Sequence, residues 1–180
     1  MGSHFLMKYQ YLNFIALGLF AAFSSTTTLH AQFLSNGSSP YDALFGSGIY
    51  QKGSEHQLTV ENQSDHDLIF CVVSVRTGRT IRNEYVRAHS DFTMTQIPEG
   101  LFYCKQVAGK GWDASAAVSG LDYGNFRWAR VYSKSDEPED YLDFRDENYW
   151  KKITVTIEAF EWQDGEAMDD IPIDESDFIL

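Results

Sequence analysis

The sequence predicts an all-β protein, a single antiparallel β-sandwich of about seven or eight short strands. Several segments of about six residues alternate polar and apolar side chains, which is the period of a half-buried strand. Turn-forming residues separate these segments, and no segment keeps a helical period beyond about eight residues. The chain is also rich in aromatic residues, with 13 Phe, 10 Tyr and 4 Trp, which favour strands and large buried contacts.

The first predicted strands surround one continuous apolar run. Residues 57–61 alternate polar and apolar side chains, and the polar run Asn62–Asp67 (NQSDHD) indicates a turn. The next segment, Leu68–Val75 (LIFCVVSV), is almost entirely apolar, so we expect a central strand that is covered on both faces. The sequence RTGR at 76–79 predicts a tight hairpin, and residues 80–86 return as the partner strand.

The following two strands lie on either side of a proline–glycine turn. Residues 92–97 form the first strand, which ends at Pro98 because proline cannot continue a ladder. Residues 101–107 form the second, and the Gly-Lys-Gly at 109–111 is expected to end it. A phosphate-binding loop is not indicated, because Lys110 is followed by Gly and Trp and no helix pattern follows.

Two further alternating segments complete the predicted sandwich. Residues 125–132 and 151–160 (NFRWARVY and KKITVTIEAF) are the strands, and the second has the clearest alternation in the chain. These limits place the sandwich domain at 57–162. Residues 32–56 are rich in Ser, Gly and Tyr and predict a loose arm, with a short turn of helix over 41–45.

The first 31 residues predict an export signal. A charged start at Met7-Lys8 precedes the apolar run 14–23 (FIALGLFAAF), and small residues follow up to Ala31. A membrane span needs about 20 apolar residues, so we expect cleavage near Ala31 and no span in the mature chain. Residues 1–6 precede Met7, which has the features of a natural start, and they take no part in the predicted fold. The protein is therefore expected to be periplasmic or extracellular.

The negative charge is concentrated near the carboxyl end. Residues 32–135 carry ten acidic and ten basic residues, whereas residues 136–180 carry sixteen acidic and three basic residues. A formal net charge of −12 argues against a nucleic-acid partner. The tail at 163–180 (QDGEAMDDIPIDESDFIL) mixes acidic and apolar residues. It predicts either a flexible acidic end or a segment that adds a strand to a sheet edge.

A series of short motifs occurs in order between about residues 57 and 160. They are IRNEYV at 81–86, IPEG at 97–100, Tyr103 and Lys105, Gly109 and Gly111-Trp112, and then Phe126 and Tyr132-Ser133-Lys134. The series resembles small exported proteins of Bacteroidetes-type bacteria that have a prealbumin-like, carboxypeptidase-regulatory-like β-sandwich. The resemblance implies the fold and the exported location, and it implies no activity.

Cys71 and Cys104 are the only two cysteines and lie on different predicted strands. An even number in an exported chain predicts one structural disulfide, and the alternative is a pair of buried free thiols. The Cys-X-X-Cys spacing of a redox motif is absent. Further His or Cys ligands at zinc-site spacing are also absent. The sequence therefore predicts no cofactor and no metal.

The sequence predicts no catalytic residue. The acidic loop around Pro138 could in principle serve a glycosidase or bind calcium, but its carboxylates are expected to stay solvated, and their spacing does not follow the calcium-loop pattern. The three histidines that follow the predicted export signal, at 56, 66 and 89, are expected at solvated turns or strand edges, and no Gly-X-Ser-X-Gly elbow is present. The carboxylates of the loop are Asp136, Glu137, Glu139, Asp140 and Asp143.

The best binding candidates are aromatic and lie on the strand at 125–132. Two-residue alternation places Phe126, Trp128, Arg130 and Tyr132 on one side of that strand. If this side is exposed, it suits contact with a carbohydrate or a protein. The alternative is that these aromatic residues form the core face. Trp112, beside the Gly-Lys-Gly, has the same two alternatives.

These observations together predict an exported, non-catalytic binding or interaction module of the cell envelope, with a protein or glycan partner. Two alternatives stay open. One is a hydrolase that acts on a glycan or peptide, and the other is a structural subunit of an envelope assembly.

Overall fold

The structure is a computed structural model that describes residues 34–135, 137–146, 149–158 and 171–180. These residues belong to one compact unit, Ala31–Leu180. The predicted export signal at 1–31 lies outside the described residues, as does the first part of the predicted tail, residues 163–170.

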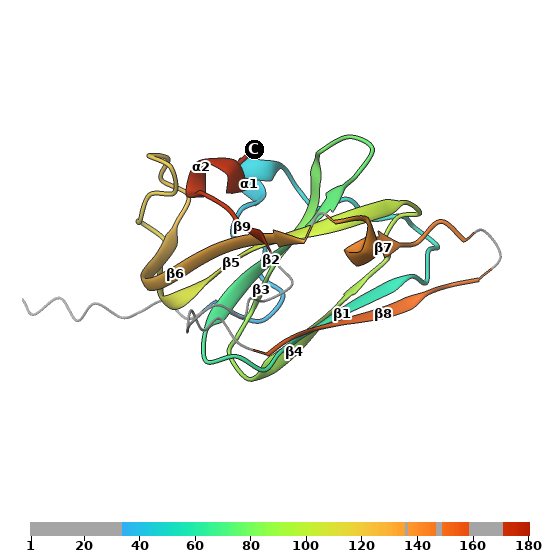
Figure 1. Cartoon of the computed structure of the whole chain (residues 1–180), viewed down its shortest axis with the longest axis horizontal. Helices are drawn as coiled ribbons and strands as arrows, with labels where there is room; N and C mark the ends of the chain where they lie inside the picture. The colour runs from blue at the N-terminus through green and yellow to red at the C-terminus, as the bar shows by residue number, and fades with distance from the viewer. Residues whose placement is uncertain (1–33, 136, 147–148, 159–170) are drawn as a thin grey trace, which may run out of the picture. The chain divides into compact units, whose positions relative to one another are not determined.

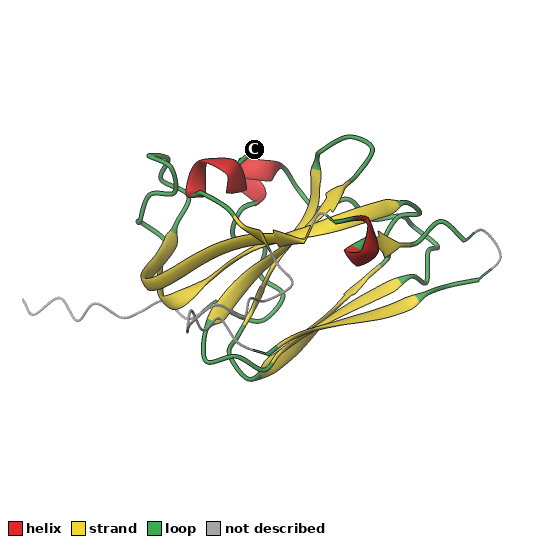
Figure 2. Ribbon diagram, in the orientation of Figure 1, coloured by secondary structure: helices red, strands yellow, loops and turns green. Residues whose placement is uncertain are grey.

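The predicted all-β sandwich is confirmed, with two sheets that form two layers (Figures 1 and 2). The smaller sheet has the order β4-β1-β8, and the larger has the order β3-β2-β5-β6-β9, with β7 paired to β5. All strand pairs are antiparallel except β1 and β8, which are parallel. The strands are β1 (Gln57–Asn62), β2 (Asp67–Ser74), β3 (Thr80–Val86), β4 (Ser90–Thr95), β5 (Leu101–Asp113), β6 (Asn125–Ser135), β7 (Leu142–Asp143), β8 (Lys152–Ile157) and β9 (Ile171–Pro172).

The inner core lies between the two sheets and is mainly aliphatic. In β1, the alternation of the sequence turns Leu58 and Val60 inward, and in β2 it turns Leu68, Phe70 and Val72 inward. All five side chains are buried. Thr59, the polar residue between Leu58 and Val60, faces outward, as expected for a strand with one solvated face.

A second core, largely aromatic, covers the outer face of the larger sheet. It contains the alternate residues Ile69 and Cys71 of β2, together with Tyr85 of β3. Strand β2 is therefore covered on both faces, which confirms the prediction made from its continuous apolar run. Figure 1 shows what covers it: the short helices α1 (Asp42–Phe45) and α2 (Glu175–Phe178) lie on the side of this sheet away from the smaller sheet.

Residues 34–56 are packed against β3 more closely than the prediction of a loose arm implies. Tyr41 is fully buried in the second core. The backbone N–H groups of Gly37 and Ile49 donate hydrogen bonds to the carbonyls of Tyr85 and Ile81, each at 2.8 Å. The predicted turn of helix within 41–45 is present as α1.

The carboxyl-terminal residues 171–180 are also docked on the larger sheet. Strand β9 pairs with β6 at Ser133 and Lys134, and α2 follows it. Phe178 is fully buried in the second core, where its ring lies 5.8 Å from that of Tyr41 and 5.4 Å from that of Tyr132. Of the two alternatives for the tail, the described part therefore adds a strand to a sheet edge.

The prediction that Gly109–Gly111 ends a strand is wrong, because β5 continues to Asp113. The pairing with β6 shifts register between Ala108 and Lys110, which is the mark of a β-bulge. A Cβ on Gly109 would lie 2.5 Å from the Cβ of Phe126. The glycine is thus needed for close packing between strands and does not form a turn.

The predicted disulfide is also wrong, since Cys71 and Cys104 are both buried and are not bonded to each other. They lie on neighbouring strands, where Cys71 pairs with Lys105 and Cys104 pairs with Val72. This offset of one residue sends the two side chains to opposite faces of the sheet. Cys71 is in the second core and Cys104 is in the inner core, so the sheet itself separates the two thiols.

Candidate functional site

The four residues predicted to share one side of β6 have different surroundings. Phe126 and Tyr132 pack into the second core, whereas Trp128 is 61% exposed and Arg130 is exposed. The core-face alternative therefore holds for Phe126 and Tyr132, and the exposed-face alternative holds for Trp128 and Arg130. Ala129, between the two exposed residues, has a φ of 51°, which is uncommon for a residue with a Cβ and marks an irregular point in this strand.

Trp128 is held as a flat platform. A Cβ on Gly111 would lie 2.4 Å from Cζ3 of Trp128, so one side of the indole ring covers the bare backbone of this glycine. Gly111 has a φ of 68°, a conformation that suits glycine. Lys110, also exposed, is the cross-strand partner of Trp128. The ring is therefore supported from one side and open to solvent on the other.

Two residues close to Trp128 in the sequence form ion pairs. The Arg127 guanidinium donates to Oδ2 of Asp113 from Nε at 3.0 Å and from Nη2 at 2.8 Å. Arg130 pairs with Glu175 of α2 at 3.8 Å. Hydrogen bonds from Ser115 and Arg127 lower the pKa of Asp113 to about 2, so this carboxylate is ionised at neutral pH and can only accept hydrogen bonds.

Trp112 is 5% exposed and belongs to the second core. Its ring lies 5.9 Å from that of Tyr41 and 5.4 Å from that of Phe126, both at steep interplanar angles. These are edge-to-face contacts of the kind that aromatic cores prefer. Of the two alternatives for Trp112, the structure therefore supports the core residue and not the surface contact.

The structure also contains a cavity of about 570 Å³ at one end of the larger sheet. Its walls are the β2–β3 hairpin at 74–79, the turn at 98–102 that opens β5, and Ile49 of the amino-terminal arm. Three arginines, Arg76, Arg79 and Arg145, lie on it. No sequence pattern groups them, because Arg76 and Arg79 fit a hairpin turn and Arg145 lies far along the chain.

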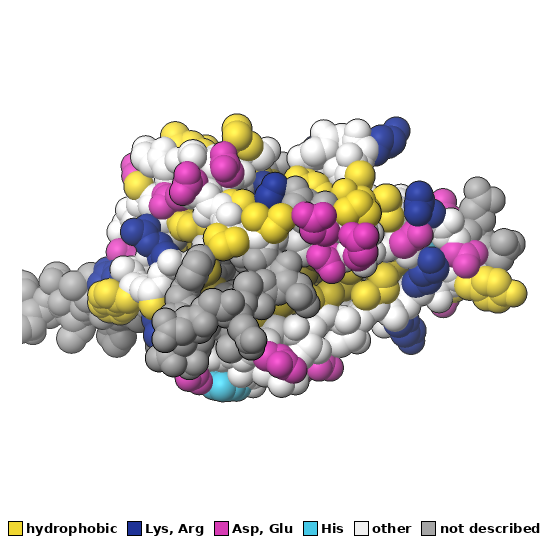
Figure 3. Space-filling model, viewed as in Figure 1, with side chains coloured by type: hydrophobic (Ala, Val, Ile, Leu, Met, Phe, Trp, Pro, Cys, Tyr) yellow, Lys and Arg dark blue, Asp and Glu magenta, His cyan; other side chains and the backbone are white. Residues whose placement is uncertain are grey.

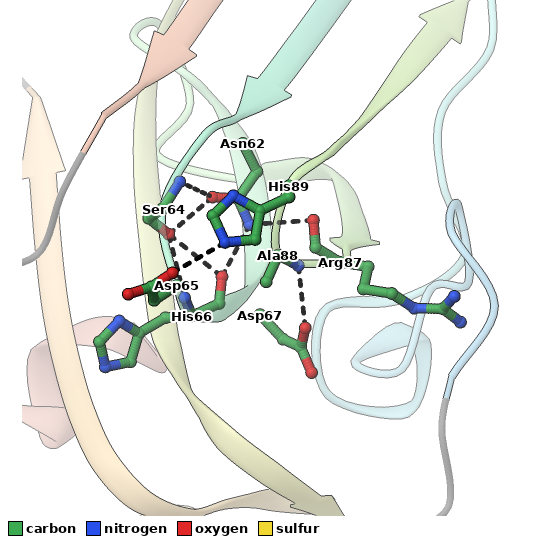
Figure 4. Close-up of polar contacts among 8 residues, drawn as sticks. All are labelled: Asn62, Ser64, Asp65, His66, Asp67, Arg87, Ala88 and His89. Carbon is green, nitrogen blue, oxygen red and sulfur yellow. Dashed lines mark hydrogen bonds and ion pairs between the residues drawn. The ribbon is translucent and has the colours of Figure 1, made fainter.

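Asn62 tethers two turns to each other, as Figure 4 shows. Its Nδ2 donates to the carbonyls of His66 and Arg87, at 2.7 and 3.1 Å, and its Oδ1 accepts from both the backbone N–H and the hydroxyl of Ser64. His89 meets Asp65 at 2.8 Å, but both side chains are well exposed. These hydrogen bonds link turns, and the two ionisable side chains among them, His89 and Asp65, are exposed. We therefore assign the network a structural role.

The prediction that His56 is solvated is wrong, because its side chain is fully buried. Its Nδ1 accepts a 2.9 Å hydrogen bond from the backbone N–H of Lys151, and its ring lies about 5 Å from those of Phe144 and Trp150.

The carboxyl group of Glu84 is a buried titratable group that the sequence analysis does not identify. It is buried beside Arg82, and burial raises its pKa to about 7 although Arg82 acts in the opposite direction.

The described part of the acidic loop forms the 3-10 helix η1 (Pro138–Asp140) and β7. Figure 3 shows acidic side chains gathered over this region, beside hydrophobic ones. Among the described residues, no group of three or more His, Cys, Asp or Glu side chains could hold a metal ion. Likewise, none of the helices in the described ranges has the length and apolar character of a membrane span.

Comparison with models of protein families, with curated proteins and with solved structures finds no match to this chain. The surfaces of the molecule itself are therefore the guide to its function, and the resemblance to prealbumin-like exported proteins stays a prediction.

Proposed function

We propose that the protein is an exported, non-catalytic β-sandwich that binds a protein or glycan partner in the cell envelope. The observation that carries this proposal is the exposed indole of Trp128, fixed over Gly111 on a strand of the larger sheet. An aromatic ring with this exposure leaves apolar area in water, and burial of that area on a partner is favourable by about 1.5–3 kcal/mol. A fixed ring also loses little conformational entropy on binding.

The surroundings of Trp128 support binding more than catalysis. Asp113 is held ionised by Ser115 and Arg127, so it does not suit the role of a general acid at neutral pH. Glu84 has the raised pKa that a general acid needs, but it is buried where a polymeric substrate has no access. Lys110, the cross-strand partner of Trp128, and Arg130, two residues further along β6, are exposed and add cationic hydrogen-bond donors.

Site-specific photo-crosslinking in the native envelope tests the contact surface. A benzophenone amino acid replaces Lys110, next to Trp128, and a matched variant carries it at Thr154, an exposed position on β8 of the other sheet. We expect a discrete adduct from position 110, none from position 154, and loss of the first adduct when Trp128→Ala is added. Equal labelling from both positions, or an adduct that survives Trp128→Ala, would contradict the proposal.

The intact mass of the protein isolated from its native host tests export. We expect a chain that begins near Gln32, since the apolar run of the predicted signal is short. A mass that still includes residues 7–31 would show that this segment is retained.

A further inference from the structure

The cavity at the hairpin end of the larger sheet has an apolar floor. Ile81 and Phe102 are almost fully buried beneath it, and Val75 is partly exposed to it. Backbone hydrogen bonds fix the walls: Ile49 N–H donates to the carbonyl of Ile81 at 2.8 Å, and Val75 N–H donates to that of Leu101 at 3.0 Å. The cavity therefore exists before any ligand arrives, and its volume of about 570 Å³ lies within the range of small-molecule sites.

The rim of the cavity is basic, although the chain as a whole carries a net charge of −12. Arg145 is neutralised, because its Nε and Nη2 donate to the two carboxylate oxygens of Asp143 at 3.0 and 2.9 Å. Arg76 and Arg79 are both exposed, and neither forms an ion pair with another residue in the described ranges. Glu99 is the one acidic residue of the lining.

We propose that this cavity binds a small amphipathic carboxylate, with its head group at Arg76 and Arg79 and its apolar chain on the floor of Ile81, Phe102 and Val75. Guanidinium groups bind carboxylates through paired, charge-assisted hydrogen bonds. The apolar floor gains from contact with a chain of about ten carbons. Arg76, Arg79 and Glu99 together leave the rim a net charge of about +1, which a singly charged carboxylate neutralises and a phosphate dianion exceeds.

The proposal is separate from the surface around Trp128, because no residue of that surface lines the cavity. It assigns the cavity a ligand of its own, and Trp128→Ala is expected to leave binding there unchanged.

Isothermal titration calorimetry of the full chain with four probes of one chain length tests the charge requirement. The probes are decanoate, decyl phosphate, 1-decanol and decyltrimethylammonium. We expect decanoate to bind with one site per chain and at least about tenfold more tightly than the alcohol or the cation. Equal affinity for decanoate and decanol would overturn the role of the arginines, and tighter binding of decyl phosphate would overturn the choice of a singly charged head group.

Two test variants, each with a matched control, locate the site. Arg76→Ala combined with Arg79→Ala should weaken decanoate binding at least about tenfold, whereas Arg87→Ala, which removes an exposed arginine outside the cavity lining, should change it little. Val75→Asp places a negative charge on the floor and should abolish binding, while the neutral control Val75→Asn should retain most of it. Unchanged affinity in the double arginine variant, with a wild-type melting temperature, would refute the proposal.

Discussion

The two faces of the larger sheet are buried by different means. The inner face packs on the strands of the smaller sheet through aliphatic side chains such as Leu58 and Val72. The outer face is covered by short segments near the two ends of the described chain, whose main anchors are the rings of Tyr41 and Phe178. One face is therefore closed by the packing of one sheet on another, and the other by irregular segments whose main anchors are aromatic side chains.

Each face also buries a charged residue, and the groups that contact the buried charge differ between the two faces. On the inner face, Arg82 pairs with Glu84 and donates a 3.0 Å hydrogen bond to the carbonyl of Thr95. On the outer face, the Lys105 ammonium lies over the rings of Phe45 and Phe178, at 4.5 and 5.4 Å. Burial lowers the pKa of Lys105. The ring of Phe178 thus both fills the second core and covers a buried cation.

The largest expected effect is on the inner face. Phe70→Ala removes a buried ring between the two sheets and should lower the free energy of unfolding by about 3–5 kcal/mol. Because the inner core joins both sheets, urea unfolding followed by circular dichroism and by tryptophan fluorescence should shift together. A loss below about 1 kcal/mol would mean that the smaller sheet contributes little to stability.

A smaller loss is expected from the corresponding change on the outer face. Phe178→Ala also removes a fully buried ring, but residues 171–180 can detach without opening the sheets, so the expected loss is about 2–3 kcal/mol. Hydrogen exchange should accelerate at the amide of Ile173, which donates to the carbonyl of Tyr132, and should stay slow in β2. Faster exchange in β2 to the same extent would contradict local detachment.

The buried carboxylate of the inner face predicts a pH dependence of stability. The folded-state pKa of Glu84, about 7, lies above its ordinary value of 4.5, so the folded protein holds a proton that the unfolded chain releases. Stability from this group is therefore full below about pH 4.5 and falls as the pH rises towards 7, by on the order of 1–2 kcal/mol. Urea titrations at pH 5 and pH 8 measure the difference.

Glu84→Gln should flatten that difference, since glutamine does not titrate. His66→Gln is the matched control. Burial lowers the pKa of His66, so its contribution has the opposite sign and is lost as the pH falls. A Glu84→Gln protein with the wild-type difference between pH 5 and pH 8 would rule out this role for Glu84.

The smallest effect is expected at the surface. Trp128→Ala should cost less than about 1 kcal/mol, because most of the ring is already exposed. Trp112→Ala, the buried counterpart on the paired strand, should cost about 3–5 kcal/mol. Thermal melts compare the two, and a drop of more than about 10 °C for Trp128→Ala would place this residue in the core instead of on a binding surface.

The inner core could be predicted from the sequence and the second core could not. Alternation over residues 57–61 and the apolar run of β2 report the side-chain period directly. Tyr41 and Phe178, by contrast, lie in segments without a clear period, and nothing local indicates that they meet. The glycines at 109 and 111 look like a turn because the sequence does not show which rings approach them.

The candidate sites were predictable only in part, for a similar reason. The alternation of the strand indicates Trp128 as a candidate, because an exposed and a buried aromatic residue are the two outcomes of one pattern, and the structure shows that Trp128 is exposed. The cavity that Arg76, Arg79 and Arg145 line is not predicted from the sequence, since its lining combines a hairpin with a residue that follows β7. The disulfide was predicted from a count of two cysteines, but the count contains no information about which face of the sheet each thiol occupies.

Those two thiols allow the most direct test of the account, because Cys71 reports on the second core and Cys104 on the inner core. Burial raises the pKa of Cys71 to about 12, so alkylation requires local opening. Iodoacetamide labelling followed by peptide mass spectrometry measures both rates in the wild-type protein and in Phe178→Ala. We predict that both thiols label slowly in the wild type and that Phe178→Ala accelerates Cys71 at least about tenfold while Cys104 is unchanged. Equal acceleration of both thiols, or none at Cys71, would contradict a second core that is closed by the carboxyl-terminal segment.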